Sequence, residues 1–327
     1  FDRKTLACSV KGNLAKEDIK LRDYVRKNKV YLENFNSNAW VILSPLEMRI
    51  KERIEKSGQP LSRWSIEINR GILTGYNKAF IIDGQKRQEL IEKDPRSEEI
   101  IKPILRGRDI LKYSIHFDDL WLINTHNGYK REDGEYVERV EIEDYPVVKE
   151  WLDTYSKKLQ ERQDQGDTPY NLRACKYQGD FEKEKIMWQE MVQEPSFYYD
   201  KQGYYCNDTG RIMTGKSLKY LLSILNSKLF YLAVKNFYGG GGLGSKGVRM
   251  KHTFFTNFCV PHISEEDEKY LVNLVEKILS ITTSSNYNPN TPPPEKHVLE
   301  NQINIKIYDL YGLEEEEIEY IEKELQY

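Results

Sequence analysis

The chain has 327 residues, of which 31% are charged and 39% are hydrophobic, a balance typical of a globular protein with one or two hydrophobic cores. Its most apolar stretch, residues 218–237, is interrupted by lysines and an asparagine. The sequence therefore has no run of the ~18–20 apolar residues that a membrane-spanning helix needs. The formal net charge of −3 hides a strongly cationic segment, residues 209–264, and a strongly acidic one that follows it.

The first half of the sequence predicts one capped helix and then a region rich in strands. Ser44, Pro45 and Glu47 form a helix start with a capping box, and Gly58 ends the helix. Alternating or apolar runs then predict strands, and a charged amphipathic pattern predicts one long helix. These elements are expected at residues 64–68, 74–83, 120–125 and 145–163.

The second half begins with further strands and ends in helices. Two runs, residues 185–191 and 195–207, read as strands, and the Lys-Gln-Gly turn at 201–203 predicts a hairpin within the second run. One helix is expected over residues 217–237, followed by a glycine-rich loop at 237–251. The last thirty residues predict two short helices separated at Gly312.

The cationic segment indicates an anionic partner. Residues 209–264 contain eight basic and no acidic side chains, whereas residues 265–327 contain fifteen acidic and five basic ones. A cationic stretch in a nearly neutral chain favours binding to phosphates or nucleic acid. The alternative is that its lysines form a solvated helix face.

The stretch GRIMTGKS, residues 210–217, fits the phosphate-loop pattern G-x-x-x-x-G-K-[ST]. Such a loop needs a buried parallel strand before it and a helix after it, because backbone N–H groups and the helix dipole bind the phosphates. A helix is predicted here, but the preceding segment is short and polar and is typical of a hairpin arm. The pattern therefore favours a strand-to-helix turn in which Ser217 caps the helix. A nucleotide-binding enzyme remains the alternative.

No other catalytic grouping is evident. Asp18 and Lys20 form only half of a metal-dependent nuclease pattern, and no glycine-rich dinucleotide turn has an acidic residue at the right spacing. We therefore expect no catalytic residue, metal site or cofactor in this chain. Four well-separated cysteines without a C-x-x-C pair favour reduced thiols in a cytoplasmic protein.

Four blocks of sequence occur in an order that is more specific than any one of them. They are GILTGYNKAFIID (71–83), IIKPILRGRDI (100–110), YLLSILNSKLFYL (220–232) and IKIYDLYGLEEEEIEYIE (305–322). Together they resemble the TaqI-like C-terminal specificity domain of single-chain restriction–modification enzymes and adenine-specific DNA methyltransferases, over roughly residues 35–327. Under this resemblance the Gly-Lys-Ser of the phosphate-loop pattern is only the start of the helix that carries LNSKL.

The resemblance implies a fold, and it implies that DNA recognition and catalysis belong to different domains. The fold is expected to be α+β, with a mixed or antiparallel β-rich target-recognition domain, packed helices and a C-terminal helical tail. The methyltransferase motif Asn-Pro-Pro-Tyr/Phe and the glycine-rich site for S-adenosylmethionine are absent, and the chain begins FDRK without an initiator methionine. The resemblance thus implies a non-catalytic double-stranded DNA reader of a type II restriction–modification or phage-defence protein. S-adenosylmethionine, and Mg²⁺ if it is used, would belong to the missing parent domains, including the methyltransferase domain that this chain would contact.

The same resemblance suggests domain boundaries. Residues 1–40 would be an N-terminal segment, the end of the catalytic half. The target-recognition domain would span 41–281, a Pro/Ser/Asn linker 282–295, and the helical tail 296–327.

Candidate DNA-binding residues are the cations, amides and aromatic rings of four loops. Sequence-reading proteins need cations for phosphates and forked or amide side chains for base edges. Arg249 is expected to contact guanine or phosphate, and Asn77 is expected to read adenine or to serve only as a turn residue. The full set is Lys246, Arg249, Lys251, Asn77, Lys78, Arg106, Arg108, Arg173, Lys176 and Tyr76. Asp109 is expected to pair internally with the two arginines beside it.

A third hypothesis is a protein–protein scaffold. In it the basic segment of one copy would bind the acidic tail of another. A DNA affinity that depends strongly on salt would argue against this alternative.

Overall fold

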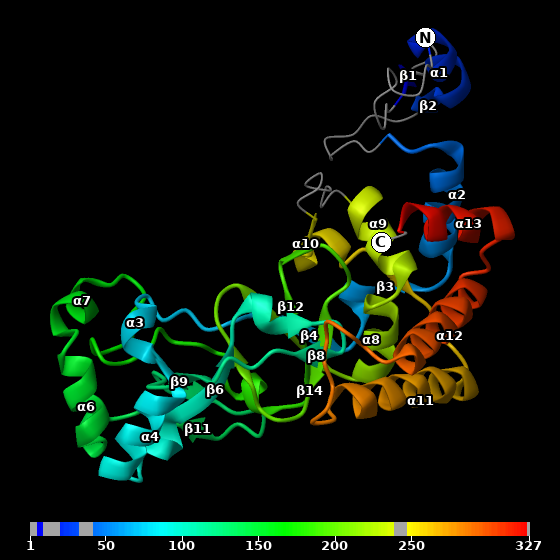
Figure 1. The fold of residues 1–327 in the computed structure, drawn as a ribbon. Helices are drawn as coiled ribbons and strands as arrows, with labels where there is room; N and C mark the ends of the chain where they lie inside the picture. Colours follow the sequence, from blue (N-terminus) through cyan, green and yellow to red (C-terminus); the bar gives the residue numbers. More distant parts are fainter. Residues whose placement is uncertain (1–4, 9–19, 33–41, 239–246, 326–327) are drawn as a thin grey trace.

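Two hydrophobic cores organise the chain, and one four-stranded sheet lies between them (Figure 1). The computed structural model describes residues 5–8, 20–32, 42–238 and 247–325. One lobe, at the right of Figure 1, is mainly helical, and the other, at the left, is a small sheet covered by helices. The α+β fold that the sequence predicts is confirmed.

The central sheet has the strand order β14-β12-β16-β4, and all neighbouring strands are antiparallel. Successive side chains of a strand point to opposite faces. Ile186 and Trp188 of β12 accordingly belong to the first core, whereas Met187 between them belongs to the second. The sheet is therefore buried on both faces. Its strands are β4 (Ile66–Arg70), β12 (Lys185–Gln189), β14 (Phe197–Asp200) and β16 (Gly210–Gly215).

The first core fills the helical lobe. Ser44 caps α2 and Glu47 completes the capping box, as the sequence predicts. Phe230 lies at the centre of an aromatic cluster, with ring centroids 5.1–5.8 Å from those of Phe197, Phe255 and Phe258. The helices of this lobe are α2 (Pro45–Lys56), α8 (Leu218–Leu225), α9 (Lys228–Asn236), α11 (Glu265–Thr282), α12 (Pro294–Leu310) and α13 (Glu315–Glu324).

The second core belongs to the other lobe. Its sheet has the order β15-β6-β9-β5, in which only β15 and β6 are parallel. The strands are β5 (Ile81–Asp83), β6 (Ile101–Leu105), β9 (Leu120–Ile123) and β15 (Tyr205–Cys206). The helices are α3 (Asn77–Phe80), α4 (Gly84–Lys93), α5 (Ser97–Ile100), α6 (Pro146–Asp153) and α7 (Ser156–Glu161).

Short paired strands and turns complete the described chain. A small N-terminal unit consists of β1 (Thr5–Ala7), α1 (Leu21–Asn28) and β2 (Val30–Leu32). The other pairs are β3 (Gln59–Pro60) with β18 (Cys259–Val260), β7 (Ile110–Leu111) with β8 (Ser114–Ile115), β10 (Tyr129–Lys130) with β11 (Tyr136–Val137), and β13 (Met191–Val192) with β17 (Val248–Arg249). The last helix is α10 (His252–Phe255), and 3-10 helices lie at Leu61–Arg63, Gly107–Asp109, Ile142–Asp144 and Gln178–Glu182.

Two helices that the sequence predicts as continuous are broken. The predicted helix 145–163 is divided into α6 and α7. The predicted helix 217–237 is divided at Asn226 and Ser227, because both side chains bind backbone groups instead of continuing the helix. The Asn226 amide bonds the N–H and the C=O of Phe197, at 3.1 and 2.9 Å, and Ser227 caps α9.

The predicted hairpin around residues 201–203 is also wrong. The strands on either side of the turn, β14 and β15, belong to different sheets. Asp200 holds the turn by accepting hydrogen bonds from the N–H groups of Gln202 and Tyr204, both at 2.9 Å. The turn thus carries the chain from the central sheet to the sheet of the second lobe.

The C-terminal helices are packed into the helical lobe. Ile303, Ile307 and Tyr308 of α12 and Ile321 of α13 are buried in the first core. The domain boundaries expected from the sequence stay a prediction. Among the helices of the described ranges, none has both the length and the apolar character of a bilayer-spanning segment.

Candidate nucleic-acid interface

The segment that fits the phosphate-loop pattern is a strand. Gly210–Gly215 forms β16, whose residues pair with β12 on one side and β4 on the other, so that Ile212 lies opposite both Met187 and Asn69. A phosphate loop needs these backbone N–H groups free to surround phosphates. Ser217 adopts a left-handed conformation (φ 52°) and its side chain does not cap α8. The nucleotide-binding alternative for this segment, and the predicted cap, are therefore wrong.

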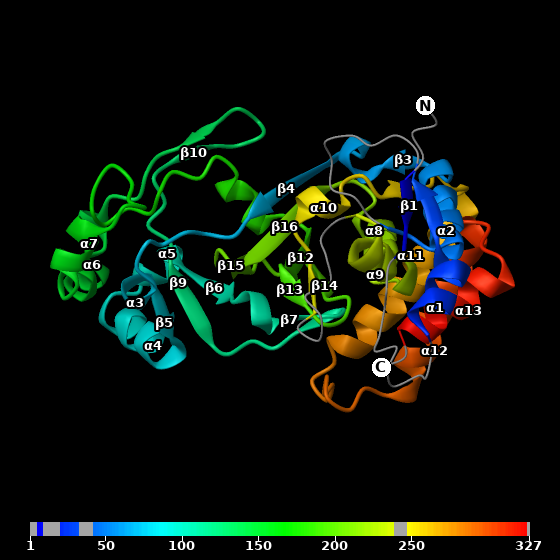
Figure 2. The same cartoon turned by 90° about the horizontal axis from the view of Figure 1, so that it is seen from above.

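The elements β4, β16 and α10 lie close together in Figure 2, and four cations belong to them and to β17, which precedes α10 in the chain. We call Arg70, Arg211, Arg249 and Lys251 the α10 patch. Arg70 and Arg211 are direct partners across the antiparallel β4–β16 pair. Directly opposite residues present their side chains on the same face. Arg249 ends β17, and Lys251 precedes the first residue of α10.

Glu190 holds two of these arginines. One of its carboxylate oxygens pairs with Nη2 of Arg211, and the other lies 3.8 Å from Nη2 of Arg249. Nη1 of Arg211 also donates to the carbonyls of Asp208 and Gly210, both at 2.8 Å. The Arg211 side chain is 14% exposed, whereas that of Arg249 is 49% exposed. Arg211 is thus a fixed cation, and Arg249 is anchored but reaches solvent.

His252 lies against the same cations. Burial lowers its pKa, and the charges of Arg211 and Lys251 lower it further, whereas Glu190 acts in the opposite direction. Its Nδ1 atom is buried and has no hydrogen-bond partner among the described residues. A neutral imidazole at pH 7 follows from this environment.

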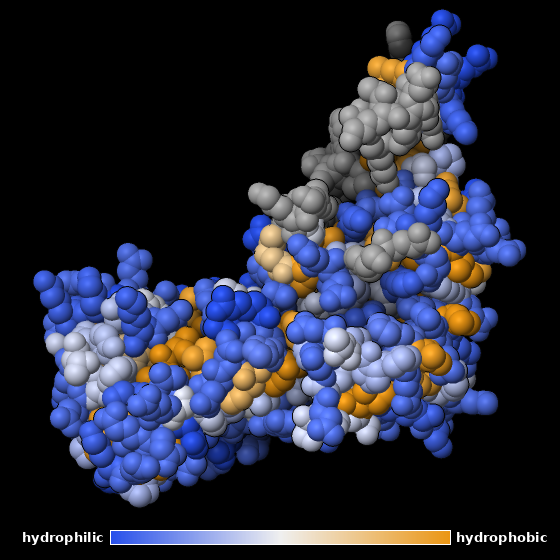
Figure 3. All heavy atoms as spheres, viewed as in Figure 1, coloured by the Kyte–Doolittle hydropathy of each residue, from blue (hydrophilic) through white to orange (hydrophobic). Residues whose placement is uncertain are grey.

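The rest of the cationic segment is partly neutralised inside the molecule. Lys219 pairs with Glu276 of α11 at 2.6 Å, and Lys228 pairs with Glu322 of α13. The acidic C-terminal helices thus neutralise Lys219 and Lys228, whereas Lys216 and Arg249 stay exposed. The face shown in Figure 3 is mostly hydrophilic, with hydrophobic residues in small separate groups.

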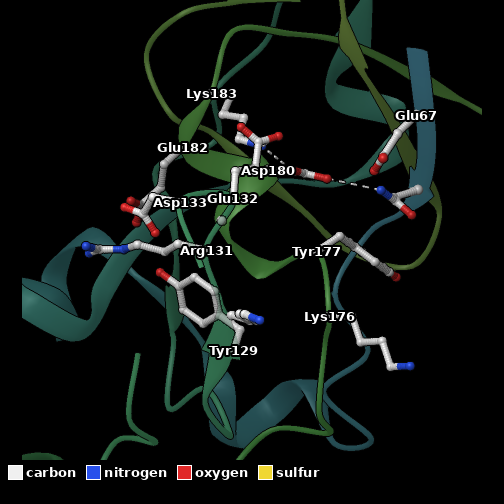
Figure 4. A pocket seen from close by; sticks show the side chains of 13 residues that line it. Glu67, Tyr129, Arg131, Glu132, Asp133, Lys176, Tyr177, Asp180, Glu182 and Lys183 are labelled. Carbon is white, nitrogen blue, oxygen red and sulfur yellow. Dashed lines mark hydrogen bonds and ion pairs between the residues drawn. The ribbon is translucent and has the colours of Figure 1, made fainter. Parts of the chain in front are cut away.

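A hollow of about 740 Å³ is lined by Glu67 and Asn69, on the face of β4 opposite to Arg70, and we call it the β4 hollow (Figure 4). One wall is tied by charge pairs, because Lys183 lies 2.7 Å from Asp180 and 2.6 Å from Glu132 of the β10–β11 hairpin. The lining residues are Glu67, Asn69, Tyr129, Lys130, Arg131, Glu132, Asp133, Lys176, Tyr177, Gly179, Asp180, Glu182 and Lys183. Arg70 acts on one residue of the lining, Tyr177. Burial raises the pKa of Tyr177 to about 12, and the positive charge of Arg70 opposes this rise.

The structure separates the DNA-binding residues that the sequence predicts. Arg249 and Lys251 lie in the α10 patch, and Lys176 lines the β4 hollow. Lys246 lies outside the described residues. Arg173 pairs with Asp164 at 3.0 Å.

Tyr76, Asn77 and Lys78 lie in the other lobe, at the start of α3. Asn77 accepts a hydrogen bond from the Thr74 hydroxyl at 2.5 Å, and the Tyr76 ring makes an edge contact with Tyr155. Their assignment to DNA stays a prediction.

Arg106 and Arg108 have different surroundings. The Arg106 guanidinium binds Asp109 and Asp118, as expected for Asp109, and these carboxylates raise the pKa of Arg106. Arg106 is therefore engaged in holding the Gly107–Asp109 turn. Arg108 is exposed and has no ion pair within the described part of the chain. Of the two, Arg108 is the one free to bind a phosphate.

Arg70 and Arg211 were missed by the sequence reasoning. Arg70 follows the predicted strand 64–68, and Arg211 lay within the phosphate-loop pattern. Only the pairing of β4 with β16 brings them together. That pairing joins residues 141 positions apart in the sequence, so no local pattern indicates it.

The family of the central part of the chain follows from comparison with known proteins. Residues 102–244 match the TaqI-like C-terminal specificity domain. The resemblance that the sequence motifs indicated is thereby confirmed. The matched part of this specificity domain includes the K-P-x-L-R-G block and the LNSKL helix. The blocks at 71–83 and 305–322 lie outside it.

A solved structure shares the fold. The chain is similar to the Type IIL restriction–modification enzyme MmeI, solved in complex with DNA, with a TM-score of 0.60 and 13% identity over 81% of this chain and 36% of that one. The type IIG restriction endonuclease BpuSI aligns with a TM-score of 0.47 and 12% identity, over 82% of this chain and 33% of that one. The chain thus spans about a third of the length of each enzyme. The comparison with curated proteins finds no match.

The specificity domain contributes only part of the interface. Glu190, Arg211 and most of the β4 hollow lie within the matched residues, whereas Arg70, Arg249 and Lys251 flank them. Within the ranges that the structure describes, no three His, Cys, Asp or Glu side chains are grouped to hold a metal ion.

Proposed function

We propose that this chain is the DNA target-recognition region of a restriction–modification enzyme and binds a specific double-stranded sequence. The observation that carries the proposal is the α10 patch beside the β4 hollow, at a specificity domain of TaqI type. The patch offers four cations, and its one carboxylate, Glu190, lies beside two of them, Arg211 and Arg249. Cations of this kind neutralise phosphates, and grooves beside them admit base edges.

The residues of the patch suit different tasks. Arg211, fixed by Glu190 and two carbonyls, supplies a preorganised charge for the DNA backbone. Arg249, which is half exposed, presents its forked guanidinium to solvent. A forked guanidinium can donate two hydrogen bonds to O6 and N7 of guanine in the major groove. We assign phosphate contacts to Arg70, Arg211 and Lys251, and a guanine or phosphate contact to Arg249.

The parent protein is proposed to be an adenine-specific DNA methyltransferase, with or without endonuclease activity, that acts in the cytoplasm in phage defence. The missing domains would bind S-adenosylmethionine, and Mg²⁺ if the parent cleaves DNA. They would methylate a base flipped out of the duplex. This chain would select the site and contribute no catalytic residue. The alignment covers 36% of the Type IIL enzyme's length, which supports a separation of DNA recognition from catalysis.

The test is selection from a pool of random-sequence duplexes, with affinity measured by fluorescence anisotropy at several salt concentrations. We expect enrichment of one short motif. With four cations engaged, the logarithm of the affinity should fall against the logarithm of the salt concentration with a slope of about −3 to −4.

Arg249→Ala and Lys251→Ala should each reduce that slope by about one, because each removes one cation at a phosphate. Lys216→Ala, an exposed lysine of the same basic segment, is the matched control and should leave the slope unchanged. The absence of any salt-dependent binding would refute the proposal and would favour the scaffold hypothesis.

A further inference from the structure

The two walls of the β4 hollow differ in how their polar groups are used (Figure 4). On one wall Lys183 pairs with Asp180 and Glu132, and Arg131 pairs with Glu135 outside the lining. On the other wall Glu67 and Lys176 are exposed and have no hydrogen-bond or ion-pair partner within the described ranges. Asn69 lies beside Glu67 and donates from Nδ2 to Asp180 at 3.2 Å, which leaves its Oδ1 free to accept. The second wall therefore has unused acceptors.

The charge of the hollow does not suit a phosphate. Its lining contains five carboxylates and four basic side chains, and the carboxylate of Glu67 is unpaired. The α10 patch begins at the next residue of β4, Arg70, whose side chain lies on the opposite face of the strand, and two of its cations, Arg211 and Arg249, share the single carboxylate of Glu190. Because β4 is the edge strand of the central sheet, a duplex that crosses this edge with its backbone at the patch would place a groove, and not a phosphate, over the hollow.

We propose that the β4 hollow reads the exocyclic amino group of one base in the major groove. Glu67 would accept a hydrogen bond from N4 of cytosine or N6 of adenine, and Oδ1 of Asn69 would be a second acceptor. Carboxylates recognise cytosine N4 and amides recognise adenine in this way. This inference rests on the proposed function and adds to it a residue that determines specificity.

The surroundings hold the Asn69 amide and the backbone of Glu67, whereas the Glu67 carboxylate is exposed. β4 is paired along its whole length with β16, so the backbone of Glu67 and Asn69 is rigid. The hydrogen bond from Asn69 to Asp180 and the pairing of Asp180 with Lys183 determine which way the amide faces. Lys176, on the same wall as Tyr177, is placed for the phosphate next to the base that is read.

The experiment compares the motifs that the intact chain and its variants select from random duplexes. In Glu67→Ala, the motif should keep all its positions except one. At that position the preference for cytosine or adenine should fall about tenfold, as expected for loss of one base contact. Affinity for unselected duplexes should stay the same or rise slightly, because a negative charge is lost. Glu319→Gln, at an exposed glutamate on α13, is the matched control and should select the wild-type motif.

A base analogue shows directly whether the amino group is read. At the affected position, adenine is replaced by purine, or cytosine by 2-pyrimidinone, each of which lacks the amino group. The wild type should lose about tenfold in affinity for the analogue, and Glu67→Ala should lose nothing further, because the two changes remove the same contact.

The outcomes separate the two proposals. If the wild type binds no DNA, the proposed function itself fails. If it selects a motif and Glu67→Ala selects the same motif at every position, DNA recognition stands and the reading by Glu67 is refuted. Binding without any selected motif would also overturn the inference, although it would leave a non-specific DNA-binding role. Melting curves that match the wild type's would exclude unfolding as the cause of a changed motif.

Discussion

At the scale of single residues, the α10 patch contains two like charges, Arg70 and Arg211, whose closeness lowers the stability of the fold. Arg70 and Arg211 are directly opposite on neighbouring antiparallel strands. Like charges in that arrangement destabilise a sheet. Glu190 relieves the repulsion for Arg211, whereas Arg70 has no ion pair within the described residues. Retention of Arg70 is explained if its charge is used by a ligand.

We therefore predict that Arg70→Thr separates stability from binding. Removal of the like charge should raise the free energy of unfolding by about 0.2–1 kcal/mol, since threonine also suits a strand. The affinity for duplex DNA should fall several-fold because one cation is lost. Urea unfolding and anisotropy titration on the same preparation measure both quantities. A less stable variant with unchanged DNA affinity would show that Arg70 is a structural residue.

His252 gives a pH dependence of binding. In the free protein its pKa is lowered, chiefly by burial and then by Arg211 and Lys251. A phosphate at the patch would raise the pKa in the complex, because it offsets these positive charges. The added affinity is then fully present below the pKa of the free protein and is lost as pH rises through the pKa of the complex.

We expect DNA affinity to increase as pH is lowered from 7.5 to 5.5, and His252→Gln to remove most of that increase. Titrations at fixed ionic strength measure it. An equal increase in wild type and variant would assign the proton to another group.

At the scale of secondary-structure elements, the sequence predicts best where the signals are local. The start of α2 is encoded within four residues, Ser44 to Glu47, and the structure contains that capping box. The break between α8 and α9 depends on Phe197, which lies 29 positions earlier in the chain. The apolar pattern of residues 217–237 is continuous across the break, so periodicity alone predicts one helix. The β16 strand is likewise not evident from the sequence, because the phosphate-loop pattern at 210–217 predicts a loop there.

Asn226 can be tested as the residue that joins α8 to the central sheet. Asn226→Ala would leave the buried N–H of Phe197 without its partner, whereas the C=O of Phe197 would keep the hydrogen bond from the N–H of Tyr113 at 3.0 Å. A buried unpaired group of this kind costs about 1–3 kcal/mol, so we predict a loss of about 1–3 kcal/mol in the free energy of unfolding. Urea denaturation measures the loss. Asn286→Ala, at an exposed loop residue, is the control and should change stability by less than about 0.5 kcal/mol. Equal stability of Asn226→Ala and wild type would contradict this role.

At the scale of the whole molecule, the central sheet joins two lobes and brings the α10 patch and the β4 hollow together. The sequence predicted the fold class and three residues of this surface, Arg249, Lys251 and Lys176, because the basic loop and the tyrosine-flanked turn are visible locally. It did not predict Arg70, Arg211 or Glu67. Their roles depend on strand pairing across the sheet and on a hollow formed by three separate segments.

Lysine footprinting with and without bound duplex tests the position of the DNA most directly. The intact chain is acetylated briefly and each lysine is quantified by mass spectrometry. DNA at the proposed surface should protect Lys251 and Lys176, whereas Lys157 on α7 and Lys323 on α13, both exposed and remote from the patch, should react as in the free protein. Protection of Lys157 or Lys323 with Lys251 and Lys176 still reactive would place the DNA elsewhere and contradict the account.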